Sequence, residues 1–127
     1  MKKNYRIITN NPLVAEELAG EDWVVYMDIS YEEVLKYVRD RIHEGHRLLS
    51  HPLSGSVKPN ETPYKSVMVS ADKGTPEPEE IAIIENAIQS CGKFAFRSDK
   101  YKPEVYKDFQ LIDWTLISSG MASADAL

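Results

Sequence analysis

The 127-residue sequence has one cysteine, Cys91, so an intrachain disulfide is excluded and a reducing compartment is expected. It has no apolar run as long as a membrane span, and its N-terminus lacks the apolar core of a secretory signal peptide. The only cluster of basic residues is Lys2 and Lys3 at the start, and the formal net charge is -5. The basic patch typical of nucleic-acid-binding proteins is therefore missing. We expect a cytoplasmic protein without nucleic-acid or membrane partners.

Familiar cofactor and metal motifs are also lacking. Neither the Gly-x-x-x-x-Gly-Lys of a P-loop nor the Gly-x-Gly-x-x-Gly of a dinucleotide site occurs. The three histidines are His43, His46 and His51, but the first two flank an expected helix end at Gly45 and no Cys/His pair has ligand spacing. We therefore expect neither a metal nor a cofactor.

The composition is that of an ordinary globular domain, with 43% hydrophobic and 28% charged residues. The length suits one domain that buries a core without disulfides or metals. We expect a single compact domain over residues 1–120 and a frayed tail of small and polar residues over 121–127.

Strand-like and helix-like segments alternate along the chain. Asn11 and Pro12 are typical of a helix start, and Ser30 with Glu33 forms a capping box. Residues 111–118 fit a helix by spacing and a strand by composition, and residues 93–96 fit a short strand or a helix end. The expected strands are 5–9, 23–27, 46–50 and 65–70. The expected helices are 12–19, 30–44, one that is entered over 75–80 and ended by Gly92, and 104–119.

This alternation predicts an α/β fold with a mostly parallel sheet of four or five strands flanked by helices, a Rossmann-like three-layer sandwich. In such sheets, ligands bind outside the carboxyl ends of the strands. Residues 9–11 follow the first expected strand, and the long loop 50–65 follows the third. If these strands are neighbours, both segments line one crevice.

The loop over residues 50–65 is the main candidate site, because a long loop in a compact domain is usually functional or disordered. Its prolines and varied polar residues argue against a flexible linker. A glycine turn between serines can form an anion-binding nest, and the helix start at Asn11 adds positive potential. The alternative is a well-capped surface turn. The candidate ligand-binding residues are Asn10, Asn11, Ser54, Gly55, Ser56, Lys58 and Asn60.

Two other functions stay open. In the first, the protein is an enzyme in which His51 acts as acid or base while residues 54–56 hold the substrate; the structural alternative is a histidine bonded within the loop. In the second, the C-terminal helix docks a protein. Its expected inward stripe is Val105, Phe109, Ile112 and Leu116, with Tyr106 and Trp114 largely off that stripe. A homo-oligomer is compatible with this surface.

Three stretches resemble the GrdX family: IITNNP near the start, RDRIHEGHRLLSHPLSGSVKPNETPYKS in the centre and FQLIDWTLI near the end. The resemblance implies a cytoplasmic accessory protein, encoded beside glycine reductase genes in anaerobic bacteria and linked to amino-acid reduction. It makes glycine reductase components candidate partners and supplies no catalytic motif. Taken with the loop, it favours an accessory α/β domain that binds a small anionic ligand.

Overall fold

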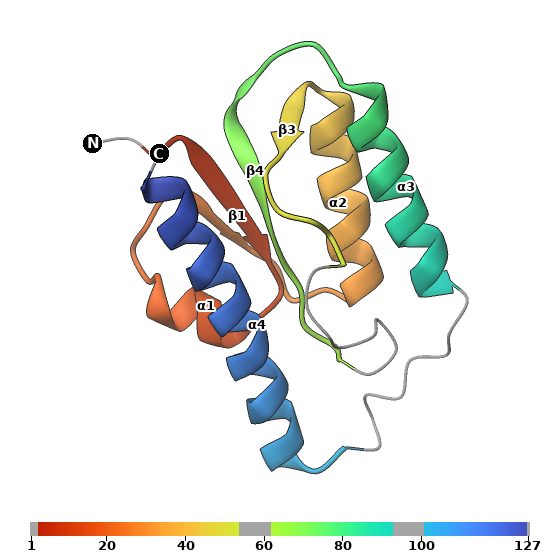
Figure 1. Ribbon diagram of the computed structural model, residues 1–127. Helices are drawn as coiled ribbons and strands as arrows, with labels where there is room; N and C mark the ends of the chain where they lie inside the picture. Colours follow the sequence, from red (N-terminus) through yellow and green to blue (C-terminus); the bar gives the residue numbers. More distant parts are fainter. Residues whose placement is uncertain (1–2, 54–61, 93–100, 127) are drawn as a thin grey trace.

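A computed structural model describes residues 3–53, 62–92 and 101–126 of the chain (Figure 1). The elements are β1 (Tyr5–Thr9), α1 (Pro12–Glu17), β2 (Val24–Tyr26), α2 (Tyr31–His43), β3 (His46–Leu48), β4 (Ser66–Lys73), α3 (Pro78–Gly92) and α4 (Pro103–Asp125). The α/β class and the single domain are as expected. The additional strand considered over residues 93–96 lies outside the described residues.

The four strands form one mixed sheet in the order β2-β1-β4-β3. Strands β1 and β2 are parallel, whereas β4 runs antiparallel to both of its neighbours. The prediction of a mostly parallel sheet is therefore wrong, and nothing in this topology confirms the Rossmann-like description. Parallel neighbours need a crossover, usually a helix. The residues described between β3 and β4 form no such helix, and the chain returns beside β3 in the opposite direction.

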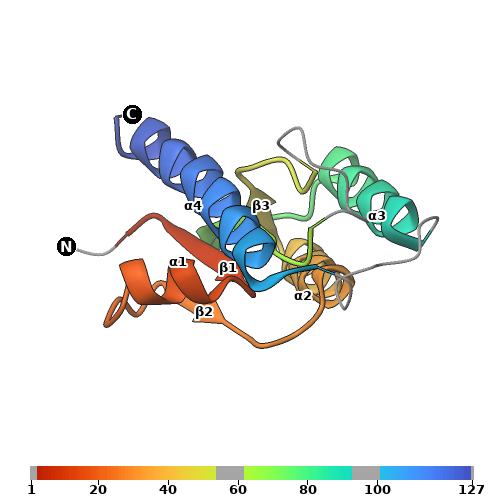
Figure 2. The same cartoon turned by 90° about the horizontal axis from the view of Figure 1, so that it is seen from below.

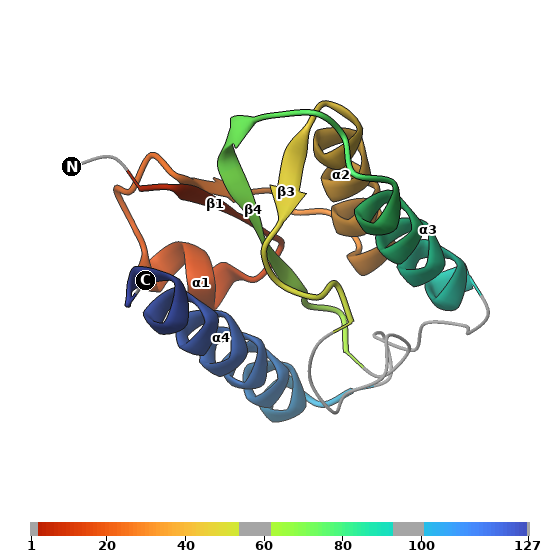
Figure 3. The same ribbon diagram turned by 45° about the horizontal axis from the view of Figure 1, so that its top comes forward.

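Helices cover both faces of the sheet, as Figures 2 and 3 show. Side chains alternate across a strand, so Ile8 of β1 packs towards α2 and α3 while Ile7 packs towards α1 and α4. Val67 and Val69 of β4 join the first cluster, and Met68 joins the second. The chain thus has a separate apolar core on each face of the sheet.

Local signals explain the ends of α2. Ser30 Oγ accepts from the backbone N–H of Glu33, and the Glu33 carboxylate accepts from the N–H of Ser30, both at 3.1 Å. This is the expected capping box. Gly45 ends the helix with a φ of 110°, a conformation that favours glycine. A Cβ at Gly45 would also collide with the backbone carbonyl of Gly74, which is a second reason for glycine at position 45.

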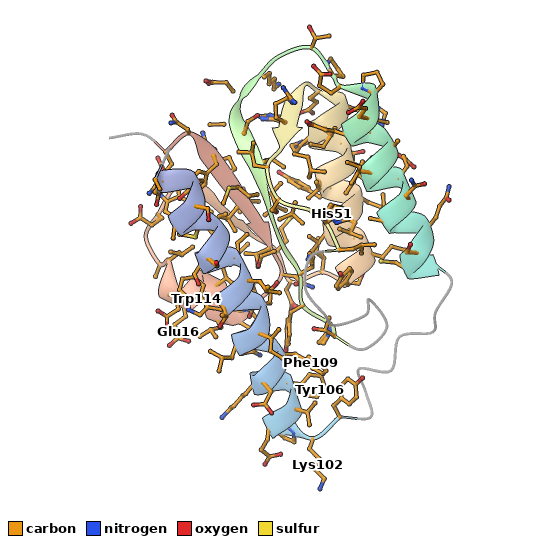
Figure 4. All side chains as sticks on the ribbon, viewed as in Figure 1. Glu16, His51, Lys102, Tyr106, Phe109 and Trp114 are labelled. Carbon is orange, nitrogen blue, oxygen red and sulfur yellow. The ribbon has the colours of Figure 1, made fainter. Side chains whose placement is uncertain are left out.

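Residues 111–118, which fitted either element, are helical within α4. The predicted inward stripe of this helix is wrong. Ile112 and Leu116 are 41% and 39% exposed, whereas Asp113 and Ile117 are buried. Trp114, labelled in Figure 4, packs against the cluster shared with α1. Helical spacing shows which residues share a face, and it does not show which face points inward when several faces are apolar.

Helix α4 continues to Asp125, further than expected, and its end is tied to the start of β1. The hydroxyl of Tyr5 donates to the Asp125 carboxylate at 3.0 Å, and the Lys3 ammonium lies 3.3 Å from it. The fraying of residues 121–127 stays a prediction. In the described part of the chain, no helix is long and apolar enough to cross a membrane.

Candidate functional site

The candidate site lies at one edge of the sheet, where β1 ends, β4 begins and the middle of α4 crosses. Because β4 is antiparallel to β1, Thr9 at the end of β1 pairs with Ser66 at the start of β4. Residues 10 and 11 therefore meet residues 62–65, the final part of the expected loop. Residues 9–11 and the end of the loop 50–65 were expected to meet because their strands would be parallel neighbours. They do meet, but because β1 and β4 are antiparallel neighbours.

Asp113 of α4 is the centre of a buried polar network. It is only 6% exposed. Its Oδ1 accepts from the backbone N–H of Ser66 at 3.0 Å, and its Oδ2 accepts from the Ser66 hydroxyl at 2.7 Å and from Asn11 Nδ2 at 3.0 Å. Three donors thus compensate the buried carboxylate, which costs little only when it is so bonded.

The hydroxyl groups of Thr9 and Ser66 lie 2.7 Å apart, and the network fixes their direction. Ser66 gives its only proton to Asp113, so the Thr9 hydroxyl must donate to Ser66. Thr9 Oγ1 in turn accepts from the backbone N–H of Asn11 at 2.9 Å. A directed chain of hydrogen bonds therefore runs from the first turn of α1 to the carboxylate in α4. Such chains strengthen each member by polarisation.

Asn10 and Asn11 hold the backbone around this network. Asn10 Nδ2 donates to the carbonyls of Ile29 and Pro63, both at 2.8 Å, and its Oδ1 accepts from the backbone N–H of Lys65 at 2.8 Å. Asn11 Oδ1 caps α1 by accepting from the N–H of Leu13 at 3.0 Å. The amide groups of both side chains are therefore bonded to protein atoms, and both side chains are buried.

A small cavity of about 20 Å³ opens beside the network, with room for about one water molecule. Lys65 lines it together with Asp113 and is only 4% exposed. Burial lowers the pKa of the Lys65 ammonium, and the negative charge of Asp113 opposes that shift. The full lining is Tyr31, Thr62, Tyr64, Lys65, Phe109, Ile112, Asp113 and Leu116.

Two further ionisable side chains lie near this cavity. Burial raises the pKa of the Tyr31 hydroxyl, with smaller contributions from Cys91 and Asp113. Burial also raises the pKa of the Cys91 thiol to about 11, with Glu32 adding to the shift and Lys65 opposing it. Both groups are therefore neutral near pH 7, and Lys65 and Asp113 carry the charge of the site.

His51 lies outside this network (Figure 4). Its side chain is exposed, and Nδ1 accepts from the backbone N–H of Leu53 at 3.0 Å. The ring is thus bonded within its own turn, and no described serine is hydrogen-bonded to it. Among the described residues, no group of three His, Cys, Asp or Glu side chains comes together to hold a metal ion.

Five predicted ligand residues lie outside the described part of the chain: Ser54, Gly55, Ser56, Lys58 and Asn60. The structure brings Asn10 and Asn11 to the edge where the loop ends. Sequence reasoning missed Lys65, Ser66 and Asp113. A signal for Asp113 was present, since it is the lone charge in the apolar run FQLIDWTLI.

Comparison with known proteins supplies a family and no closer relative. No curated protein and no solved structure matches the chain. A family model described as GrdX-like protein matches residues 6–122, nearly the whole chain. The protein therefore belongs to the GrdX-like family.

Proposed function

We propose that this GrdX-like protein is an accessory domain that binds a small anionic ligand at the β1–β4 edge. The observation that carries the proposal is a lysine, Lys65, that is 96% buried and lines a cavity. Burying an ammonium group is costly, and a buried charged side chain that lines a cavity is typical of a functional site. Lys65 is thereby the principal cation of the proposed site.

Hydroxyl groups around the cavity add neutral donors. Tyr64 Oη accepts from Gln110 Nε2 at 3.0 Å, and Thr62 Oγ1 accepts from the backbone N–H of Tyr64 at 3.2 Å. Each hydroxyl that accepts in this way still has its own proton to donate. Donors of this kind beside a cation suit the oxygen atoms of a carboxylate or phosphate.

The size of the cavity limits what enters. About 20 Å³ admits one oxygen atom of a ligand, so the rest of the ligand would lie at the mouth. Phe109, Ile112 and Leu116 also line the cavity and would favour a small apolar group on the ligand. We propose that Ser54, Gly55, Ser56, Lys58 and Asn60 complete the site from the loop.

Asp113 also lines the cavity and would repel an anion, but three donors already share its charge. An anion beside Lys65 favours the charged form of the lysine, so binding should raise the Lys65 pKa. Ligand binding at pH values near or above the lowered pKa of Lys65 is then accompanied by proton uptake. That uptake separates binding at Lys65 from binding elsewhere on the surface.

The proposal is tested by the shift in melting temperature that sodium phosphate and sodium acetate produce at constant ionic strength. We expect Lys65→Met and Lys58→Ala each to give a smaller shift than the wild type, because each lacks a cation of the proposed site. The matched control is Lys36→Met, which removes an exposed lysine of α2 that pairs with Glu32. Equal shifts in the wild type and Lys65→Met would rule the site out and assign the effect to salt.

A second candidate function is protein docking by α4, favoured by three exposed leucine and isoleucine side chains. Leu111, Ile112 and Leu116 are 55%, 41% and 39% exposed. Exposed apolar residues that adjoin one another often mark an interaction site. We propose a glycine reductase component as the partner, because the family resemblance links the chain to that system. Leu111→Ser with Leu116→Ser should abolish co-purification with that component, and unchanged co-purification would reject the docking function.

The aromatic residues named for docking are less available than expected. Tyr101 packs against Tyr106 and Phe109 at ring-centroid distances of 5.8 and 5.4 Å, and Trp114 packs on the core. The enzymatic alternative has less support, because His51 is bonded within its own turn and the neighbouring Ser50 hydroxyl accepts instead from the backbone N–H of Met68.

A further inference from the structure

A second cavity, of about 150 Å³, lies between the sheet and α2. It is lined by Arg6, Ile8, Val25, Tyr37, Arg41, His46 and Val69. Arg6 is three residues from Thr9, so the two residues are about 10 Å apart along β1. Arg6 also points to the α2 face with Ile8, and this cavity shares no lining residue with the one at Lys65.

The charged residues that line this cavity are all basic. Two guanidinium groups, those of Arg6 and Arg41, line it together with the imidazole of His46, and no carboxylate is among its lining residues. His46 is held in place because its Nδ1 lies 2.7 Å from the carbonyl oxygen of Ser70. The cavity therefore joins at least two positive charges to an otherwise apolar wall.

Both arginines retain donors that no acceptor in the described part of the chain uses. The one hydrogen bond of the Arg6 side chain is a long one, 3.4 Å, to the carbonyl of Tyr5, and no described carboxylate lies within ion-pair distance of it. Arg41 Nη2 pairs with Glu44 at 3.0 Å, whereas its Nε is buried and has no acceptor. A buried donor without an acceptor is destabilising and is uncommon in folded proteins.

The Arg41 guanidinium is nevertheless well ordered by its neighbours. It stacks on the ring of Tyr37, with Cζ 4.5 Å from the ring centroid. A stacked guanidinium keeps its edge free for hydrogen bonds in the plane, the geometry that suits a carboxylate or phosphate. Tyr37 therefore positions Arg41 for an anion.

We propose that this cavity binds a small anion, a carboxylate or a phosphate group, between Arg6 and Arg41. The anion's oxygen atoms would accept from both guanidinium groups, and Ile8, Val25 and Val69 would contact any apolar part of the ligand. The volume is sufficient, because about 10–15 Å³ already admits a water molecule. The carboxyl end of α2 places about half a negative charge nearby and Glu44 pairs with Arg41, so Arg6 supplies the positive charge that no described carboxylate balances.

This site goes beyond the proposed function, which concerns Lys65 at the other end of β1. The test is a titration of ¹⁵N-labelled wild-type protein with sodium phosphate and, separately, sodium acetate, followed by two-dimensional NMR at an ionic strength held constant with sodium chloride. We expect saturating shifts of the backbone amides of Arg6, Arg41 and His46. Saturation by one salt and not the other identifies the oxyanion that the site takes.

Variants assign the binding to the two arginines. Arg6→Gln should weaken the affinity at least tenfold. The matched control is Arg39→Gln on α2, which makes the same charge change at an arginine that pairs with Asp40 and Glu85 and does not line the cavity. Neither Arg39→Gln nor Lys65→Met should change the affinity of this site.

Three results would overturn the proposal. These are the absence of saturating shifts at the cavity residues with either salt, an equal response to sodium chloride, and an affinity loss no greater in Arg6→Gln than in Arg39→Gln. The titration of the wild-type protein alone decides the first two results, so the proposal can be rejected even if a variant folds poorly. Shifts confined to Thr62, Lys65 and Asp113 would reject this site and leave the proposed function standing.

Discussion

Asp113→Ala gives the most direct test of the buried network that joins α4 to the sheet. The change removes both carboxylate oxygens and leaves the Ser66 N–H and one Asn11 amide proton without acceptors. The Ser66 hydroxyl can turn to another acceptor, but those two donors stay buried. An unsatisfied buried donor costs about 1–3 kcal/mol, so the two together should lower the free energy of unfolding by about 2–6 kcal/mol.

Asp113→Asn should cost less, about 1–3 kcal/mol, because its amide oxygen can still accept from the Ser66 N–H. Its amide nitrogen then faces the Asn11 amide, so one donor meets another. A larger loss of unfolding free energy in Asp113→Ala than in Asp113→Asn is therefore a property of this network. An ordinary surface aspartate would show no such difference.

Urea denaturation followed by circular dichroism and tryptophan fluorescence measures both variants. The matched control is Asp108→Ala, an exposed aspartate on the same helix, which should change the free energy of unfolding by no more than about 0.5 kcal/mol. An Asp113→Ala loss as small as that of Asp108→Ala would refute the network as the anchor of α4.

Three further predictions concern protonation and packing. Because burial raises the pKa of Cys91 to about 11, iodoacetamide should alkylate it about 100-fold more slowly than a free thiol at about pH 8, and a rate equal to that of free cysteine would contradict this. Burial lowers the pKa of Lys65 below 10.5, so between the folded pKa and 10.5 the unfolded chain binds more protons than the folded protein. In that pH window the unfolding free energy of the wild type relative to Lys65→Met should therefore rise with pH. A difference that does not change with pH would count against the pKa shift. Trp114→Ala should cost about 3 kcal/mol by urea denaturation and leave the elution volume in size-exclusion chromatography unchanged, while the exposed Leu116→Ser should cost about 0.5 kcal/mol or less.

The sequence predicted those parts of the fold that depend on neighbouring residues. The Ser30–Glu33 box, the cap at Asn11 and the glycine at position 45 each act within a few residues, so the starts of α1 and α2 and the end of α2 were found. The alternation of elements gave the α/β class and helices on both faces. Interactions between residues close in sequence can be predicted from the sequence alone.

The direction of β4 could not be predicted in the same way. Val67, Met68 and Val69 are buried, and such a run looks the same in a parallel or an antiparallel strand. The connection decides the direction, and the absence of a helical pattern between β3 and β4 was a usable signal. The inward face of α4 was missed for a related reason: Asp113 is buried because Ser66, distant in sequence, bonds to it.

The candidate site was predicted in location more than in composition. Residues 9–11 and the end of the 50–65 loop do meet at one edge. Lys65 was read only as the start of a strand, because nothing in the sequence tells a buried lysine from an exposed one. Its burial depends on α4, which arrives from far along the chain.

The central claim is that Lys65 is the cation of an anion site at the β1–β4 edge. Calorimetric titration of Arg6→Gln protein with sodium phosphate and sodium acetate tests it, because that background weakens the second proposed site. We predict binding accompanied by proton uptake at pH values near or above the lowered pKa of Lys65, an affinity at least tenfold weaker in Arg6→Gln/Lys65→Met, and no change in Arg6→Gln/Lys36→Met. No binding of either salt, or equal affinity with and without Lys65, would contradict the account.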